Sequence, residues 1–159
     1  MKKVLIITYY WPPAGGPGVQ RWLKFVKYLP EFGIEPIVYC PENPNYPIMD
    51  TSMVSEVSST LEVIQAPINE PYKLAQLLSR SKTSDLSKGI ITGQKKQTIT
   101  EKLLLFVRGN FFIPDARVSW VKPSVSFLSD YIKTHKIDTI ITTGPPHSLH
   151  LIGLKLKQL

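Results

Sequence analysis

Three glycines and an arginine are the residues best placed to do chemistry in this chain. Gly15, Gly16 and Gly18 lie in the loop 11–18, and Arg21 follows one helical turn later. Glycine lets backbone N–H groups approach a phosphate closely, because it has no Cβ. A helix that starts here adds the partial positive charge of its N-terminus, and Arg21 can add a full charge. The loop therefore predicts a site for a phosphorylated or otherwise anionic ligand.

The segments on either side of this loop are predicted to be a strand and a helix. The apolar run over 3–9 is typical of a strand buried on both faces. Helical spacing of apolar residues starts at Gly18 and continues to residue 31, and Gly33 is placed to end that helix in a left-handed conformation. A tight turn without a ligand is the simpler alternative for the same residues.

Predicted strands alternate with predicted helices along the rest of the chain. We expect strands over 34–40, 61–66 and 137–143, the second more exposed and the last buried. We expect helices near 71–80, over 100–108, near 116–135 and from 146 onward, with an irregular segment at 41–60 and a loop at 81–98. Pro123 makes the 116–135 helix either start later or bend. This order predicts a Rossmann-like α/β fold, with a doubly wound, mostly parallel sheet and helices on both faces.

A second group of polar residues follows the last expected strand, at 143–148. Ligands of doubly wound sheets bind beyond the carboxyl ends of the strands, so this segment is a candidate for the same cleft as the glycine loop. His147 could meet a substrate hydroxyl there, although a lone histidine is often structural. Asp115 is either a helix cap or a cleft residue, and Arg117 and Trp120 either line the cleft or pack.

The composition limits the class of protein. The chain has 159 residues, enough for one domain, and a net charge of +7 that favours anionic partners or simply a basic, soluble surface. Cys40 is the single cysteine, which excludes an internal disulfide and suits a reducing cytoplasm. No stretch approaches the roughly 18 apolar residues of a membrane span.

Several kinds of site are excluded or weakened by the residues present. The dinucleotide fingerprint lacks its third glycine, since Arg21 stands there, and Glu42 is a poor match for its acid. No Gly-Lys-Ser/Thr motif is present, which excludes a P-loop. The spacing of the three histidines and Cys40 offers no metal site, and the basic residues lack the interleaved aromatics of nucleic-acid modules.

Three motifs, in order along the chain, resemble those of family 4 glycosyltransferases of a bacterial branch. They are residues 9–21 (YYWPPAGGPGVQR), 114–120 (PDARVSW) and 143–148 (TGPPHS). The resemblance implies a GT-B architecture of two Rossmann-like domains, of which residues 1–159 would be the N-terminal, acceptor-side one. The C-terminal nucleotide-sugar-binding domain would be absent from this chain, which ends at Leu159 within an amphipathic helix. Such enzymes retain anomeric configuration, usually need no metal, and use front-face attack by the acceptor hydroxyl as the nucleotide diphosphate departs.

The resemblance also implies roles for individual residues, with a nucleotide sugar as co-substrate and no other cofactor. His147 would be catalytic, beside the transferring sugar or the acceptor hydroxyl. The donor diphosphate would be bound by Gly15, Gly16, Gly18 and Arg21. The acceptor side would include Asp115, Arg117, Trp120 and Ser148.

A basic segment between residues 80 and 102, followed by apolar residues up to 113, suits the surface of an anionic membrane. A solvated loop followed by a core helix is the alternative.

From the three motifs we expect the acceptor-binding domain of a retaining glycosyltransferase in cell-surface polysaccharide synthesis. Its partners would be a nucleotide sugar and a glycan or lipid-linked acceptor, and its location the cytoplasm, at the inner face of the plasma membrane. A non-catalytic domain that binds a sugar phosphate or a membrane surface is the alternative function.

Overall fold

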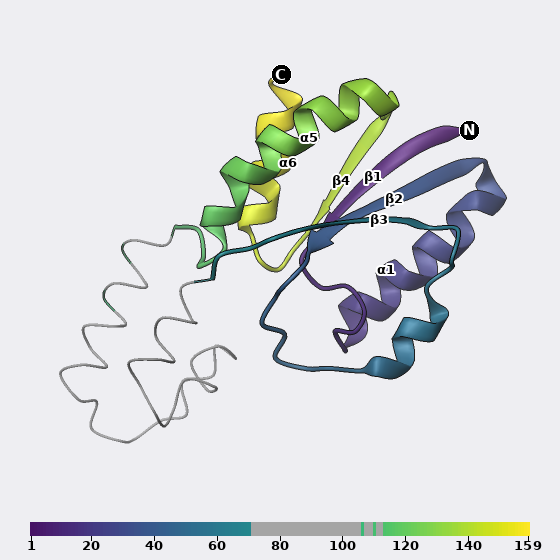
Figure 1. The fold of residues 1–159 in the computed structure, drawn as a ribbon, viewed down its shortest axis with the longest axis horizontal. Helices are drawn as coiled ribbons and strands as arrows, with labels where there is room; N and C mark the ends of the chain where they lie inside the picture. The colour runs from purple at the N-terminus through teal and green to yellow at the C-terminus, as the bar shows by residue number, and fades with distance from the viewer. Residues whose placement is uncertain (71–105, 107–109, 111–112) are drawn as a thin grey trace.

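The fold is built on a parallel β-sheet, seen in a computed structural model that describes residues 1–70, 106, 110 and 113–159. The sheet has four strands in the order β3-β2-β1-β4, all parallel (Figure 1). The strands are β1 (Lys2–Thr8), β2 (Ile34–Pro41), β3 (Glu62–Ala66) and β4 (Thr139–Thr143). The predicted α/β fold with a parallel sheet is confirmed.

Helices cover both faces of this sheet. Helix α1 (Pro17–Tyr28) lies on one face, and α5 (Val121–His135) and α6 (Ser148–Lys157) pack together on the other (Figure 1). Three short 3-10 helices are η1 (Leu29–Phe32), η2 (Thr51–Glu56) and η3 (Val118–Trp120). Parallel strands can be joined only by crossovers, which place helices on the faces of the sheet. The doubly wound arrangement is therefore also as predicted.

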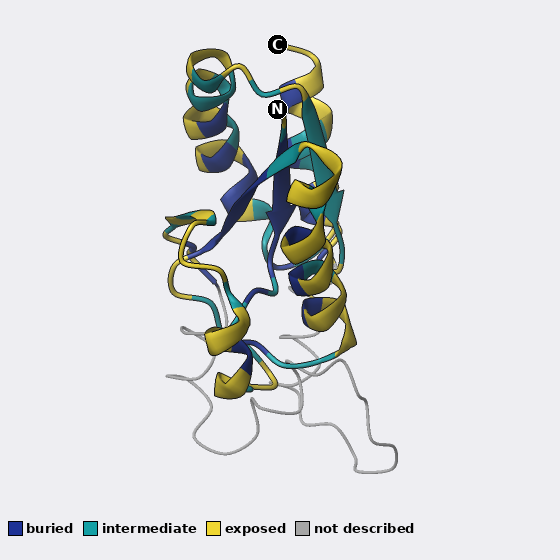
Figure 2. Cartoon of the chain, turned by 90° about the vertical axis from the view of Figure 1, so that its right-hand side faces the viewer, coloured by how far each residue is buried: buried dark blue, intermediate teal, exposed yellow. Residues whose placement is uncertain are grey.

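Strand β1 is buried on both faces, which explains its uninterrupted apolar run. Leu5 and Ile7 belong to the core under α5 and α6, whereas Val4 and Ile6 belong to the core under α1. Successive side chains of a strand point to opposite faces, so both faces need apolar residues when both are covered. Figure 2 shows β1 buried between helices whose outer surfaces are exposed.

The two edge strands differ from the central pair. In β3, Glu62 and Gln65 are exposed, as the alternation of its residues predicted. The prediction of a fully buried last strand is wrong, because all five residues of β4 are half-buried. Among the described residues β4 pairs with β1 alone, so no described strand lies beside its other edge.

The helix boundaries are set by proline and glycine. Gly33 has a φ of 73° after η1, the left-handed conformation that was predicted. Helix α5 begins at Val121, the later start that was predicted as the alternative to a bend, and this places Pro123 in the first turn, where its missing N–H does no harm. Helix α6 begins at Ser148 rather than at Pro146. The expectations for 71–80, 81–98 and 100–108 fall on residues outside the described part, apart from Phe106.

Helix α6 packs closely on β4 through a glycine. A Cβ added at Gly153 would lie 2.6 Å from Cγ2 of Thr142, which is too close for two carbon atoms. The small residue therefore brings α6, and the turn that precedes it, down onto the end of β4.

Candidate functional site

Two turns lie side by side at the carboxyl edge of the sheet. The first is the glycine turn (residues 14–18), which follows β1, and the second is the His147 turn (residues 143–148), which follows β4. The parallel register of the two strands pairs Thr8 with Thr143. The indole Nε1 of Trp22 in α1 donates a 2.7 Å hydrogen bond to Oγ1 of Thr143. The two halves of the predicted site are therefore neighbours in the fold, as the strand order requires.

Gly15 shapes the glycine turn but does not offer its amide to a ligand. A Cβ at this position would lie 3.0 Å from Cγ2 of Ile48 and 3.1 Å from Cβ of Asp50. The Gly15 N–H donates a 3.0 Å hydrogen bond to the carbonyl of Ile48. Glycine is thus needed here for close packing against the loop 41–50, and the expectation of a free amide at Gly15 is not met.

Gly16 and Gly18 are the glycines of this turn that have free space beside their Cα atoms. Gly16 has a φ of 113°, which L side chains rarely adopt, and it is the N-cap of α1 without a side-chain capping bond. A Cβ at either glycine would meet no atom within 4 Å. Neither N–H is bonded to another described residue. The start of α1 is therefore open, and its first turn holds no acidic residue.

The charges around the open helix start favour an anion. Arg21 is exposed one turn into α1, and none of the described carboxylates pairs with it. Asp50 is the acidic residue that packs against the glycine turn, but its Oδ1 accepts a 3.1 Å hydrogen bond from the N–H of Ser52. That carboxylate therefore caps η2, and the positive end of α1 is left without an acidic side chain bonded to it.

The His147 turn presents an imidazole to solvent. His147 is exposed and is the N-cap residue of α6, although its side chain makes no capping bond. Its ring centroid lies 6.1 Å from that of His150, whose Nδ1 shares a 2.9 Å hydrogen bond with Oγ1 of Thr142. His150 is thereby tied to β4, whereas the His147 ring is available to a ligand.

Asp115 closes the start of α6. Its Oδ2 accepts a 2.8 Å hydrogen bond from the N–H of Ser148, and its Oδ1 accepts a 2.9 Å bond from the hydroxyl of that residue. The same Oδ1 accepts a 2.8 Å bond from the N–H of Arg117. The local bond to the N–H of Arg117 agrees with the expected capping of the segment that follows Asp115. The bonds to Ser148 add a second role, because Asp115 also caps α6, 33 residues away in the chain.

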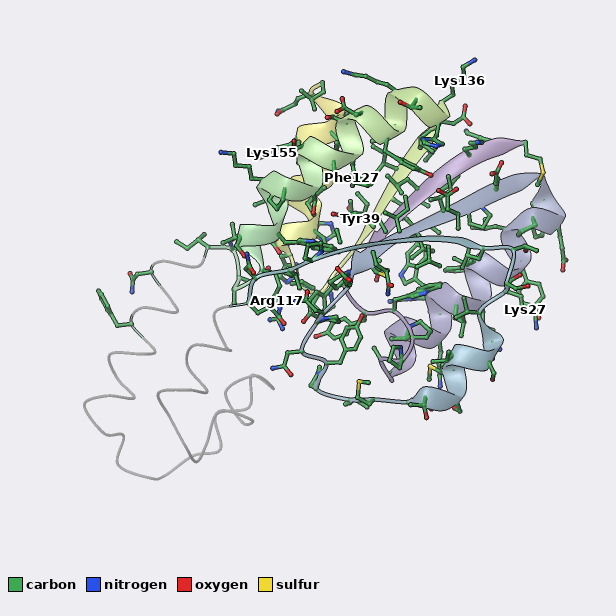
Figure 3. The ribbon with its side chains drawn as sticks, viewed as in Figure 1. Lys27, Tyr39, Arg117, Phe127, Lys136 and Lys155 are labelled. Atoms are coloured by element: carbon green, nitrogen blue, oxygen red, sulfur yellow. The ribbon has the colours of Figure 1, made fainter. Side chains whose placement is uncertain are left out.

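Arg117 lies over the ring of Tyr9 at the carboxyl edge of the sheet, near the start of α5 (Figure 3). Its Nε is 3.0 Å from Oε1 of Glu70, so the two side chains pair by charge rather than through an aligned hydrogen bond. The exposed fractions of the two side chains are 12% for Arg117 and 0% for Glu70. The guanidinium carbon is 4.8 Å from the centroid of the Tyr9 ring. Most of the charge of Arg117 is thus directed into the protein rather than toward a ligand.

Glu70 and Tyr9 are residues of this site that sequence reasoning missed. The Tyr9 hydroxyl donates a 2.7 Å hydrogen bond to Oε1 of Glu70, and the N–H of Asn45 donates a 2.8 Å bond to Oε2. Burial raises the pKa of Tyr9 above its ordinary value of 10.0, so that the phenol stays a donor. The available signal was a tyrosine at the end of a buried strand, but nothing in the sequence pairs it with Glu70.

Trp120 is a core residue. It is 1% exposed, and its ring stacks on that of Tyr39 with centroids 5.1 Å apart. The stack continues to Phe127 on α5, 6.2 Å from Tyr39 (Figure 3). The indole of Trp120 therefore packs against the sheet, and Ser148 is equally buried, at 1% exposed.

The described residues hold no group of three or more His, Cys, Asp or Glu side chains that could bind a metal ion. A pocket of about 390 Å³ lies between the last turn of α1, the first residues of β2 and the segment 56–61. It is at the amino end of the strands, so the glycine and His147 turns do not line it. None of the described helices has the length and apolar character needed to cross a membrane. The predicted membrane contact falls largely on residues outside the described part.

The chain was compared with protein-family models, with curated proteins and with solved structures. No family model matches it, and neither a curated protein nor a solved structure does.

Proposed function

We propose that this chain is the acceptor-side domain of a retaining glycosyltransferase, which transfers a sugar from a nucleotide sugar to a glycan or lipid-linked acceptor. One observation carries the proposal. An open helix start at Gly16 and the exposed His147 each follow one of two adjacent parallel strands, so both lie at the carboxyl edge of the sheet. An anion held by the first would have its substituents next to the imidazole of the second.

The amides of Gly16 and Gly18 and the guanidinium of Arg21 would bind the diphosphate of the donor. As the bond between the anomeric carbon and the diphosphate oxygen breaks, negative charge grows on that oxygen, where these groups stabilise it. The acceptor oxygen forms its new bond to the anomeric carbon on the same face, and its proton passes to the departing phosphate. His147 would orient the sugar or the acceptor hydroxyl by a hydrogen bond.

The residues predicted to bind the acceptor substrate mainly contact other protein groups of this site. Asp115 and Ser148 bond to each other, Arg117 pairs with Glu70, and Trp120 is in the core. We propose that the half-buried Asp115 and Arg117 form the wall against which the acceptor lies, and that the buried Ser148 and Trp120 support this wall. The resemblance to family 4 enzymes adds a second domain with most donor contacts, and a setting in cell-surface polysaccharide synthesis at the inner face of the plasma membrane.

The first test is binding by the isotope-labelled chain. UDP or GDP should shift the amide resonances of Gly16 and Gly18, and inorganic phosphate should do so more weakly, while the amides lining the pocket at the amino end stay unchanged. Nucleotide-induced shifts confined to residues away from the glycine turn would contradict the proposal.

The second test is transfer by the full-length protein with a panel of nucleotide sugars. The substitution His147→Ala should lower kcat by about 10²-fold or more, and His135→Ala, at the far end of α5, is the matched control. An unchanged rate for His147→Ala would remove His147 from the site. If nucleotides bind at Gly16 but no acceptor is glycosylated, the chain is a sugar-phosphate-binding module instead.

A further inference from the structure

Glu70 is a buried acidic residue to which the proposed reaction gives no role. Its side chain is fully buried, and its two oxygens are occupied by Tyr9, Arg117 and the N–H of Asn45. Because both oxygens are engaged by protein groups, neither faces a position where a bound substrate could donate a proton to it. A buried ion pair is also a poor source of stability, because desolvation opposes its attraction. The position of Glu70 in the network therefore needs another explanation.

On one side, Glu70 holds the loop that supports the glycine turn. The N–H of Asn45 donates a 2.8 Å hydrogen bond to Oε2 of Glu70. Three residues later, the carbonyl of Ile48 accepts the 3.0 Å bond from the N–H of Gly15. The loop 41–50 is thus fixed at one point to Glu70 and at another to the glycine turn.

On the other side, Glu70 holds the segment that caps α6. Its Oε1 lies 3.0 Å from Nε of Arg117, and the N–H of Arg117 donates a 2.8 Å bond to Asp115. Asp115 in turn accepts the 2.8 Å bond from the N–H of Ser148, the residue next to His147. A short chain of contacts therefore joins Glu70 to the His147 turn.

We infer that Glu70 is a positioning residue, which holds the glycine turn and the His147 turn in a fixed relative position. Apolar packing alone would bury these loops without fixing their register. The hydrogen bonds from Tyr9 and Asn45 orient the Glu70 carboxylate, and its charge holds Arg117 beside it. The functional consequence rests on the proposed transferase activity, but the structural linkage does not.

Hydrogen exchange tests the linkage without any activity. In Glu70→Gln we expect amide exchange to become about tenfold faster at Gly15 and at Ser148, which Glu70 does not touch, as well as at Asn45 and Arg117. The core amides of α1 at Leu23 and Val26 should keep their protection. Glu35→Gln is the matched control, because Glu35 pairs with Lys3 on the surface at the amino end of the sheet. Unchanged protection at Gly15 and Ser148 would overturn the inference.

If Glu70→Gln does not fold, the double variant Glu70→Gln/Arg117→Met removes both charges and leaves no unpaired ion. It should show the same faster exchange at Gly15 and Ser148, and full protection there would contradict the inference. In the full-length protein, a positioning role predicts a loss of about 10²-fold in kcat with little change in donor KM. If exchange is faster in Glu70→Gln but the unmodified full-length protein has no transferase activity, the proposed function is wrong and the linkage stands. If exchange is unchanged in Glu70→Gln but the unmodified protein is active, the linkage is wrong and the proposed function stands.

Discussion

The two helix starts at the carboxyl edge of the sheet have the same place in the fold but opposite electrostatics. At α6 the carboxylate of Asp115 bonds to the N–H and the hydroxyl of Ser148, so the positive end of that helix is neutralised within the protein. At α1 the N-cap is Gly16, with no capping side chain and no acid in the first turn. The open end can accept an anion, and the closed end can hold a histidine steady beside it. This difference is the reason why we propose that α1 binds the ligand and that α6 positions His147.

The largest effect on this comparison is expected from Arg117→Met. This substitution leaves Glu70 charged and buried without its cation, so the free energy of unfolding should fall by about 3–5 kcal/mol. Urea unfolding followed by circular dichroism measures this change. Arg21→Met, on the exposed side of α1, is the control and should cost under about 0.5 kcal/mol. If Arg117→Met also cost under about 0.5 kcal/mol, the ion pair of Arg117 and Glu70 would not stabilise the α6 side of the site.

Asp115→Ala should open the closed helix start. Ser148 would lose the acceptor for both its N–H and its hydroxyl, and we expect a loss of about 1–3 kcal/mol in the free energy of unfolding. Ser148→Ala removes the hydroxyl bond alone and should cost less. Equal costs for the two variants would show that the backbone bond to Asp115 contributes nothing.

Alkaline pH should lower the free energy of unfolding, because buried groups on both faces of the sheet have raised pKa values: Tyr9 and Tyr39 under α5 and α6, and Cys40 under α1. Burial raises the pKa values of Tyr9 and Tyr46 above the ordinary 10.0, and raises that of Cys40 from 9.0 to about 12. These groups stay protonated when folded and lose protons at lower pH when unfolded. The stability they contribute is thus fully present below pH 9 and is lost as pH rises toward 12.

Urea titrations at pH 7, 9 and 11 should therefore show a decline that begins above pH 9. The decline should be shallower in Cys40→Ala and in Tyr46→Phe, each of which lacks one of the raised pKa values. A free energy of unfolding independent of pH up to 11 would contradict the assignment of raised pKa values to these buried groups.

Gly16→Ala and Gly18→Ala should separate conformation from ligand binding at the open helix start. Gly16→Ala should cost about 1–2 kcal/mol because its φ is 113°, whereas Gly18→Ala, inside α1, should gain up to about 1 kcal/mol. UDP affinity should fall in both variants if the two amides bind phosphate. Calorimetric titration of each variant with UDP measures this, and wild-type affinity in both would place the anion elsewhere.

The smallest effect is expected from Gln20→Glu. A carboxylate in the first turn of α1 should add about 0.3–1 kcal/mol of stability, because it supplies the negative charge that this helix start lacks. The same carboxylate should weaken UDP binding by competing for the open end. A gain in UDP affinity would contradict the proposal that positive charge at the start of α1 binds the diphosphate.

Much of the fold followed from local patterns in the sequence. The apolar run of β1, the helical spacing of α1 and the left-handed Gly33 have causes that lie within a few residues of one another. At Pro123 the sequence left two alternatives, a bend in the helix or a later start, and the structure shows the later start. The half-buried state of β4 could not be predicted, because exposure of an edge strand depends on how many neighbours it has.

The site divides in the same way. The glycines, Arg21 and His147 could be selected as candidates because each follows a predicted strand, and parallel strands bring their carboxyl ends to one edge. The role of Gly15 could not be predicted, since it depends on contact with Ile48 in a loop of irregular structure. Nor could the cap that Asp115 places on α6, 33 residues along the chain.

By itself, then, the sequence determined the alternation of strands and helices and the two turns that meet at the carboxyl edge, because these depend on local periodicity and on glycine and proline. Only the tertiary structure decided which helix start is open and which is closed. It also decided that a buried carboxylate, Glu70, lies between them. The hydrogen-bond and ion-pair partners of a polar group depend on which residues lie near it in space. When these residues are far apart in the chain, no local sequence pattern predicts the pair.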